Sequence, residues 1–297
     1  MRAHLKGIFP AVASPCDDQD MFLEDRFAAL VADLYRAGVN GLYVCGGTGD
    51  GYRMRLEERK RAAQIALDLS ERTHGRVIVH VGTTNSRDAI ELATHAAASG
   101  AAAISSMPPP GADLGELRNY YSEIARAAGI PVLIYHLPSR ATAVPTLDQL
   151  LALLDIEGVV GLKLSDWNLF FMRRLRLARP ELVIFNGFDE FLYPGLLYGA
   201  QGGIGMWYNL FPRLFVGVYA AVQAADHAKA IALQDCLLSF LDLAWRYGLE
   251  PVFELLMNRR GYGPHCFRRP RPEVPPEVRG QMERELEARV AAVEAAA

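Results

Sequence analysis

A regular alternation of short apolar runs with helix-like segments, over roughly the first 210 residues, is the feature that most constrains the fold. Short runs rich in Val, Ile and Leu are typical of parallel strands buried on both faces. Eight such runs joined by helical crossovers favour one closed (β/α)8 TIM barrel over an open doubly wound sheet. The predicted strands are Gly7–Val12, Gly41–Val44, Val77–Val81, Ala102–Ser106, Val132–Tyr135, Val159–Lys163, Leu182–Phe185 and Gly202–Ile204.

Beyond Pro212 the pattern becomes helical throughout. A length of 297 residues is compatible with one large barrel plus an extension. We therefore predict a catalytic barrel at residues 1–211 and an all-helical C-terminal extension at 212–297, packed on the barrel. The predicted C-terminal helices are Leu214–Ala225, Ala228–Tyr247, Pro251–Arg260 and Pro276–Ala296.

Charge and cysteine content favour a small-molecule partner. The net charge of −3 gives no electrostatic footprint for nucleic acid or an anionic membrane. The four cysteines are widely spaced and form no metal-ligand motif, so we expect free thiols in a reducing compartment and no metal. No apolar run reaches about 18 residues and no signal peptide is evident, so a cytoplasmic location is expected.

Two of the predicted strands end in residues that do not suit a buried strand. Tyr135 ends PVLIY, and Lys163 ends VVGLK. A buried lysine is costly unless it snorkels to the rim, forms an ion pair or loses its proton. A neutral amine is what a Schiff-base nucleophile requires. The strand alone does not decide between a lysine that snorkels or forms an ion pair and a lysine that acts as a Schiff-base nucleophile.

Other polar or glycine-rich segments also follow strands, where the active site of such a barrel lies. The turn Cys45–Gly51 has bare backbone N–H groups that, with the Thr48 hydroxyl, could hold a carboxylate, although a tight turn without a ligand has the same sequence. Ser165 follows Lys163, and Asn186–Glu190 follows the seventh strand. No phosphate-binding loop is present at a strand–helix turn.

Five motifs occur in a characteristic order: GGTGD, YHLPSR, GLKLSD, NGFDE and GAQGGIGMWYN. From Gly7 to the terminal helices the chain resembles the dihydrodipicolinate synthase and N-acetylneuraminate lyase family of class I aldolases. The resemblance implies an (α/β)8 barrel with a helical extension, assembled as a homotetramer or dimer. It also implies chemistry on 2-oxo acids through a lysine imine, with no organic cofactor or metal.

The resemblance assigns roles to five positions in the inner part of the site. Lys163 matches the Schiff-base lysine, and Tyr135 matches the tyrosine that shuttles the proton of the substrate hydroxyl. The backbone of Gly47 with Thr48 matches the carboxylate clamp. Ile204 matches the apolar residue beside the imine.

The segment from Leu182 to Asn209 is most similar to the sialic acid lyase branch. There the counterparts of four residues contact the hydroxyls of a sugar-acid tail: Ser165, Gly187, Asp189 and Glu190. The two carboxylates could equally be an N-cap pair of a helix.

Several positions depart from the family pattern. Gly47 replaces a Ser or Thr, so one clamp hydroxyl is missing. Met206 and Trp207 replace Ser and Thr of the lyase branch, which removes a hydroxyl partner and narrows the pocket. Pro108 and Pro109 replace paired aromatics, one of which the synthase lends to a neighbouring subunit's proton relay. We therefore expect neither dihydrodipicolinate synthesis nor faithful sialic acid cleavage.

Arg140 matches an arginine of the synthase branch that binds a distal carboxylate. A guanidinium would select an acid group at the far end of the substrate, whereas a surface arginine beside a turn is the alternative. Together with Asp189 and Glu190 it suggests a polyhydroxylated or dicarboxylic 2-oxo acid.

The sequence thus predicts a pyruvate-dependent aldolase or lyase. It would cleave or form a 2-oxo-3-deoxy sugar acid, or a related 4-hydroxy-2-oxo acid, yielding pyruvate and an aldehyde on cleavage. A dehydratase acting on a 2-keto-3-deoxy sugar acid or aldarate through the same imine is the alternative. A third possibility, from a different class, is a protein that binds a keto acid without turnover.

Overall fold

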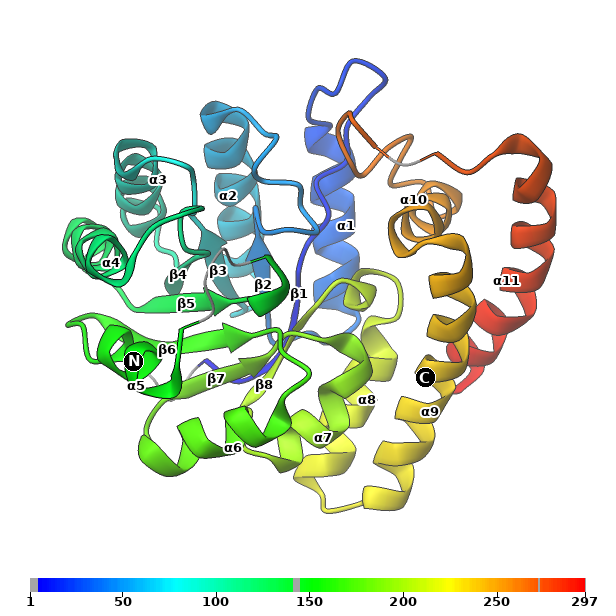
Figure 1. Cartoon of the computed structure of the whole chain (residues 1–297). Helices are drawn as coiled ribbons and strands as arrows, with labels where there is room; N and C mark the ends of the chain where they lie inside the picture. The colour runs from blue at the N-terminus through cyan, green and yellow to red at the C-terminus, as the bar shows by residue number, and fades with distance from the viewer. Residues whose placement is uncertain (1–4, 141–144, 272, 297) are drawn as a thin grey trace.

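The computed structural model describes residues 5–140, 145–271 and 273–296, and it confirms the predicted TIM barrel. Eight parallel strands surround a central axis, with helices on the outside (Figure 1). The strands are β1 (Gly7–Pro10), β2 (Gly41–Val44), β3 (Arg76–His80), β4 (Ala103–Ser106), β5 (Val132–His136), β6 (Val159–Leu164), β7 (Val183–Asn186) and β8 (Gly202–Gly205).

Continuous ladders run from β2 through β3 to β8 and then to β1. The remaining seam, between β1 and β2, is closed by a single parallel bridge between Ala11 and Tyr43. Beside it the Val12 amide donates to the Tyr43 carbonyl at 2.9 Å, and the Ile8 amide donates to the Asn40 Oδ1 atom at 2.8 Å. The barrel is therefore nearly closed. Backbone hydrogen bonds and the Asn40 side chain together join β1 to β2.

Two of the outer helices begin at capping boxes that can be recognised in the sequence. Asp113 and Thr146 each form a reciprocal capping box, with Glu116 and Gln149 respectively. The outer helices are α1 (Glu24–Arg36), α2 (Leu56–Glu71), α3 (Ser86–Ala98), α4 (Leu114–Ala128), α5 (Leu147–Leu154), α6 (Leu169–Ala178), α7 (Leu192–Leu197) and α8 (Pro212–Gln223), with short 3-10 turns η2 (Pro138–Arg140), η3 (Asp189–Phe191) and η4 (Trp207–Asn209).

Three further helices follow the barrel: α9 (His227–Tyr247), α10 (Leu249–Arg259) and α11 (Pro276–Ala296). They pack along one side of the barrel in Figure 1. One continuous hydrophobic core includes both barrel residues and residues of these helices, and the division at residue 211 stays a prediction. None of the helices in the described ranges combines the length and the hydrophobicity of a membrane span.

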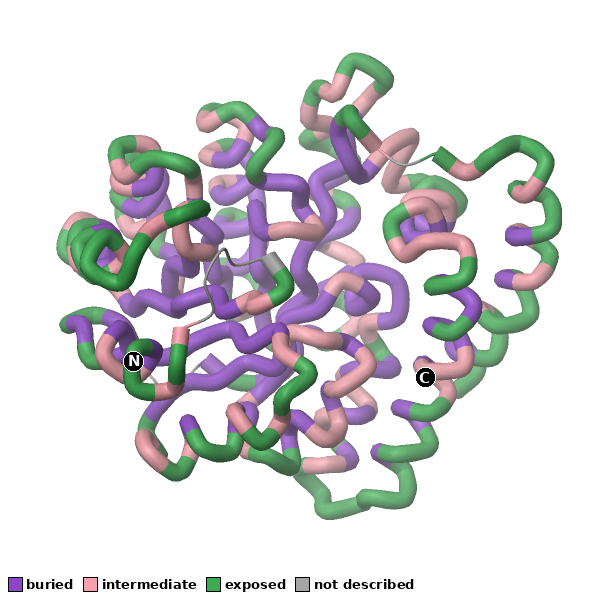
Figure 2. Tube along the Cα trace, in the orientation of Figure 1, coloured by how far each residue is buried: buried purple, intermediate pink, exposed green. Residues whose placement is uncertain are grey.

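Two apolar layers alternate along each strand, because successive side chains of a strand point to opposite faces. One layer, which includes Phe9, Tyr43, Leu133, Phe185 and Ile204, fills the barrel interior. The other packs between the strands and the outer helices. Figure 2 shows the strands as the buried centre, with exposed residues confined to the outer faces of the helices and the loops.

Candidate active site

Lys163 points into the barrel. Its neighbours Leu162 and Leu164 belong to the layer between strands and helices, so strand alternation turns Lys163 to the interior. The side chain is 4% exposed, and its Nζ atom lies 4.3 Å from the ring centroid of Tyr135 and 4.9 Å from that of Tyr43. No carboxylate of the described residues forms an ion pair with it. The snorkelling and ion-pair interpretations are therefore wrong.

A cavity of about 420 Å³ opens at the carboxyl ends of the strands. It contains nine of the ten residues that the sequence singles out. Arg140 ends η2, and its side chain lies outside the described residues. The nine lining residues are Gly47, Thr48, Tyr135, Lys163, Ser165, Gly187, Asp189, Glu190 and Ile204. The structure brings these nine residues together around one cavity, and the role of each residue stays a prediction.

The turn after β2 is held in place by Asp50. The Asp50 amide donates to the Gly47 carbonyl at 3.0 Å, which closes the turn around Thr48. The Asp50 carboxylate accepts from the Arg268 amide at 2.7 Å and from the Arg53 guanidinium at 2.8 Å. The turn that carries Gly47 and Thr48 is thus tied to the loop that precedes α11.

Asp189 is buried but has a free carboxylate oxygen. Its Oδ2 atom accepts from the Trp207 amide at 2.8 Å, whereas its Oδ1 atom has no partner among the described residues. The residue caps no helix of its own, because Phe188 occupies the N-cap of η3, and the N-cap interpretation is wrong for Asp189. Burial, and then the charge of Glu190, raise the pKa of Asp189 to about 7.

Ser165 and Gly187 fit together closely. The Ser165 hydroxyl is buried and has no partner in the described part of the chain. A Cβ atom on Gly187 would lie 2.0 Å from the Ser165 Oγ atom. Glycine at 187 is therefore required for the Ser165 hydroxyl to stand beside the cavity, where it is available to a ligand.

His80 and Tyr43 also face Lys163 from the barrel interior, and the sequence analysis did not select them. The His80 ring lies 6.2 Å from the Tyr135 ring, and its Nε2 atom accepts from the Met107 amide at 3.2 Å. Burial, then the charges of Arg59 and Lys163, lower the pKa of His80 well below its usual value. His80 is the last residue of strand β3, and Lys163 and Tyr135 also lie at the ends of predicted strands. A polar side chain at the end of a buried strand is therefore the signal that could have identified His80.

The departures from the family pattern have different structural consequences. Met206 and Trp207 both line the cavity, but the Trp207 ring packs edge to face against Phe240 at 4.9 Å and Phe253 at 5.7 Å. Trp207 is 2% exposed, so it mainly joins the barrel to the helices α9 and α10. The methionine is therefore the residue of this pair that reshapes the cavity wall.

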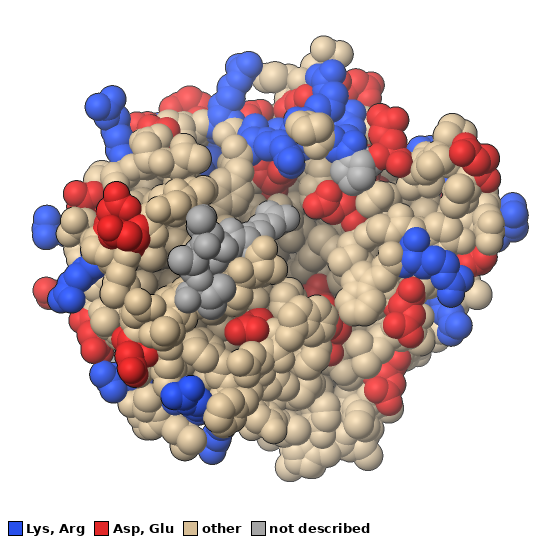
Figure 3. Space-filling view, viewed as in Figure 1, with Lys and Arg blue, Asp and Glu red and all other residues tan. Residues whose placement is uncertain are grey.

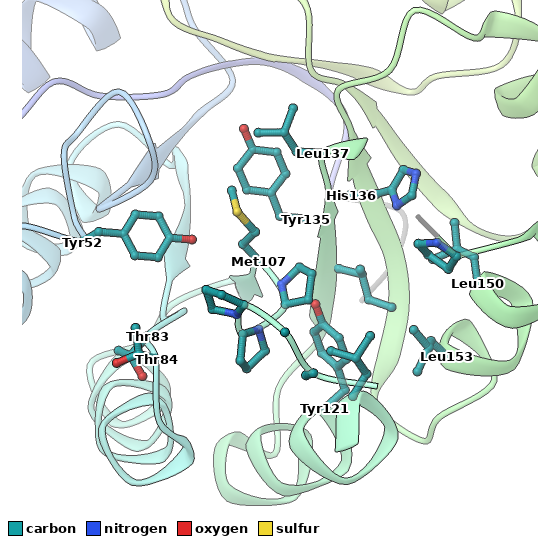
Figure 4. A pocket seen from close by; sticks show the side chains of 18 residues that line it. Tyr52, Thr83, Thr84, Met107, Tyr121, Tyr135, His136, Leu137, Leu150 and Leu153 are labelled. Carbon is teal, nitrogen blue, oxygen red and sulfur yellow. The ribbon is translucent and has the colours of Figure 1, made fainter. Parts of the chain in front are cut away.

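A second, smaller cavity of about 240 Å³ lies beside the first (Figure 4). Pro108 and Pro109, the prolines that replace the paired aromatics, line this cavity together with Pro110. It shares Met107, Tyr135 and Leu137 with the cavity around Lys163. Among the described residues no cluster of His, Cys, Asp and Glu could hold a metal ion.

Comparison with known proteins gives a consistent result. Residues 4–289 match the Dihydrodipicolinate synthetase family. An N-acetylneuraminate lyase of Rhizobium meliloti is 33% identical over 270 residues, which are 90% of this chain and 89% of that protein. The corresponding lyase of Citrobacter koseri is 34% identical over 254 residues, 84% of each chain.

Solved structures agree with the sequence matches. The sialic acid aldolase of Ruminococcus gnavus superposes with a TM-score of 0.91 at 25% identity over 98% of both chains. A Clostridium difficile protein solved in complex with mannosamine gives a TM-score of 0.89 at 26% identity, over 96% of this chain and 99% of that one.

Proposed function

The chain belongs to the dihydrodipicolinate synthetase family and is a lyase of its class I aldolase type, and we propose that Lys163 carries the imine of its reaction. The observation that supports this assignment is the placement of the Nζ atom inside the barrel, 4.3 Å from the Tyr135 ring and facing the same cavity as Thr48. The substrate is a 2-oxo-3-deoxy sugar acid or a related 4-hydroxy-2-oxo acid, and its cleavage yields pyruvate and an aldehyde.

Substrate binding begins at the carboxylate. The amide groups of the turn at Gly47, together with the Thr48 hydroxyl, hold the carboxylate of the 2-oxo acid. The amine of Lys163 then adds to the ketone carbon, and loss of water gives an iminium ion. Ile204, which is fully buried, packs beside this centre and helps to exclude water.

Cleavage then uses the iminium as an electron sink. Tyr135 accepts the proton of the C4 hydroxyl as the C3–C4 bond breaks, and the electron pair of that bond forms an enamine with the lysine nitrogen. The aldehyde leaves. Tyr135 returns this proton to C3, and water hydrolyses the imine to release pyruvate and the free amine. The residues therefore supply the whole reaction without an organic cofactor or metal.

The aldehyde half lies against Ser165, Gly187, Asp189 and Glu190. The unpartnered Ser165 Oγ and Asp189 Oδ1 atoms are suited to the hydroxyl groups nearest the cleaved bond, because buried polar atoms gain most from a new hydrogen bond. We further propose a cytoplasmic homo-oligomer, a tetramer or dimer. The four free cysteines are consistent with a reducing compartment.

Borohydride reduction in the presence of pyruvate tests the assignment of Lys163. A reduced pyruvyl adduct on the peptide that contains Lys163, detected by mass spectrometry and absent from Lys163→Ala, is the expected result. An intact, folded protein that gains no adduct would instead be a keto-acid-binding protein without turnover. Circular dichroism of the variant controls for folding.

The same enzyme preparation distinguishes cleavage from dehydration. A 3-deoxy-2-oxo sugar acid is supplied, and free pyruvate is measured together with the total 2-oxo acid. Accumulation of pyruvate and an aldehyde in equal amounts supports the aldolase. A dehydrated oxo acid without pyruvate would assign the chain to the dehydratase alternative.

A further inference from the structure

Aromatic side chains from separate elements meet at the outer edge of the cavity. We call Trp167, Phe188 and Trp245 the aromatic rim. The Trp167 ring lies 4.7 Å from the Phe188 ring, tilted by 32°, and 6.4 Å from the Trp245 ring. Trp167 follows β6, Phe188 follows β7 and Trp245 lies near the end of α9. Three segments distant in sequence thus build one aromatic surface.

The aromatic rim belongs to the same cavity as Lys163, since all three residues line it. Trp167 is 53% exposed and Trp245 is 46% exposed, although large aromatic rings gain free energy by burial. The Phe191 ring packs edge to face against Trp167, with ring centroids 5.1 Å apart, so the exposed indole is held in position. A fixed, solvent-facing aromatic surface at the entrance to a reactive amine is suited to the distal part of a substrate.

The charges of the cavity wall restrict what that distal part can be. Among the described residues that line the cavity, Lys163 is the basic residue. The acidic residues are Asp189, Glu190 and Glu250. Lys163 is at the inner end and Asp189 is buried with a pKa of about 7, whereas Glu190 is half-buried and Glu250 is exposed, so the carboxylates of the outer wall are those of Glu190 and Glu250. Figure 3 shows carboxylate residues beside the hollow on this face, with Lys and Arg residues above it. A second carboxylate near the aromatic rim would meet like charges, which disfavours its binding.

We propose that the aromatic rim is a subsite for a flat, uncharged, apolar group at the far end of the substrate's aldehyde half. This inference rests on the proposed function. The substrate would be a 4-hydroxy-2-oxo acid whose hydroxyl meets Ser165 and Asp189, and whose terminal group stacks on Trp167. The prediction of a dicarboxylic substrate, made from Arg140, is disfavoured by this arrangement.

The first test is aldol addition of pyruvate to three aldehydes: 3-phenylpropanal, D-erythrose and succinic semialdehyde. The expected order of kcat/KM places 3-phenylpropanal first. Trp167→Ala should lower kcat/KM for 3-phenylpropanal by about three- to tenfold, the range of one aromatic stacking contact, and change the value for D-erythrose by less than twofold. Trp167→Phe should restore most of the loss.

Phe170→Ala is the matched control. Phe170 is also an exposed aromatic residue of the β6–α6 region, at 68% exposure, but it does not line the cavity. Phe170→Ala should leave kcat/KM unchanged for all three aldehydes. The inference is overturned if D-erythrose or succinic semialdehyde is preferred tenfold, or if Trp167→Ala lowers all three values alike. It is also overturned if that variant changes only the oligomeric state, which would make the aromatic rim a subunit contact.

A binding measurement separates this inference from the proposed chemistry. In Lys163→Ala, which cannot form an imine, the dissociation constant of 2-oxo-4-phenylbutanoate is compared with that of 2-oxoglutarate by isothermal titration calorimetry. Tighter binding of the phenyl compound, lost in Lys163→Ala/Trp167→Ala, supports the subsite whatever the outcome of borohydride trapping. Equal or tighter binding of 2-oxoglutarate overturns the subsite even if the pyruvyl adduct forms.

Discussion

Tyr135 and Lys163 are direct register partners on the neighbouring parallel strands β5 and β6. The pairing fixes both backbone positions, and strand alternation turns both side chains into the barrel, where the amine lies 4.3 Å from the phenol ring centroid. The relationship between amine and phenol is therefore set by the sheet, which is the most rigid part of the molecule. A small shift in a loop would leave it intact.

Replacement of Tyr135 by Phe should separate imine formation from bond cleavage. The ring that packs beside Lys163 remains, so the pyruvyl adduct should still form under borohydride. Turnover should fall by about 10²–10⁴-fold, because the proton of the C4 hydroxyl loses its acceptor. Trapping and steady-state cleavage are measured on the same preparation.

Tyr43→Phe is the control for this prediction. Tyr43 also faces Lys163, at 4.9 Å, but its hydroxyl is engaged with Ser105 Oγ at 3.2 Å and it does not line the cavity. Its loss of turnover should be much smaller than that of Tyr135→Phe. Comparable losses in the two variants would show that the hydroxyl of Tyr135 has no special part in proton transfer.

Gly47→Ser should strengthen binding of the 2-oxo acid. A Cβ atom at residue 47 would have no heavy atom within 4 Å, so the cavity has room for the side chain. A serine hydroxyl would add one hydrogen bond to the carboxylate, worth about 0.5–1.5 kcal/mol. The KM for pyruvate in aldol addition should fall by about two- to tenfold.

Gly47→Ala fills the same space without a hydroxyl and should leave that KM near the value of the unchanged protein. If the alanine and serine variants behave alike, the turn does not bind the carboxylate. The comparison therefore tests the clamp as well as the substitution.

Asp50 should stabilise both the fold and the clamp turn. Asp50→Ala leaves the buried Arg268 amide without its acceptor, which should cost about 1–3 kcal/mol of unfolding free energy. The KM for pyruvate should rise as the turn loosens around Thr48. Chemical denaturation and steady-state kinetics measure the two effects.

Arg53→Ala removes only the other partner of Asp50, an arginine side chain that is 46% exposed. Such an ion pair contributes up to about 1 kcal/mol, so stability and KM should change little. An equal effect of the two variants would mean that the exposed ion pair, rather than the Arg268 amide, holds the turn.

The inner part of the site was predictable because its polar residues interrupt the apolar pattern that a buried strand requires. A lysine and a tyrosine at the ends of buried strands conflict with the apolar pattern, and a period of two along a strand then fixes their direction. His80 carries the same signal, since it is the last residue of β3, whereas the predicted strand runs on to Val81. The capping boxes at Asp113 and Thr146 depend on a spacing of three residues and were equally predictable.

The outer part of the site could not be predicted in this way. Trp167 and Trp245 lie 78 residues apart in the sequence, and their approach depends on how α9 packs beside the barrel. The link between Asp50 and Arg268 likewise joins segments from opposite ends of the chain. Such contacts are set by tertiary packing, which leaves no period or spacing in the sequence.

Asp189 should make the stability of the protein depend on pH between about 4 and 7. Its pKa is raised from 3.8 to about 7 by burial and by Glu190, so the folded state holds a proton that the unfolded chain releases. Its contribution to stability is therefore fully present below about pH 4 and is lost as pH rises through about 7. Between pH 5 and 8 the loss should reach about 2–3 kcal/mol.

Asp189→Asn removes this titration and keeps an oxygen acceptor for the Trp207 amide. The variant should therefore lose less unfolding free energy than the unchanged protein when urea denaturation is repeated at pH 5 and at pH 8. Asp242→Asn, at an exposed carboxylate of α9, should follow the unchanged protein at both pH values. If Asp189→Asn does the same, the Asp189 carboxyl is not the buried acid that the structure places beside the cavity.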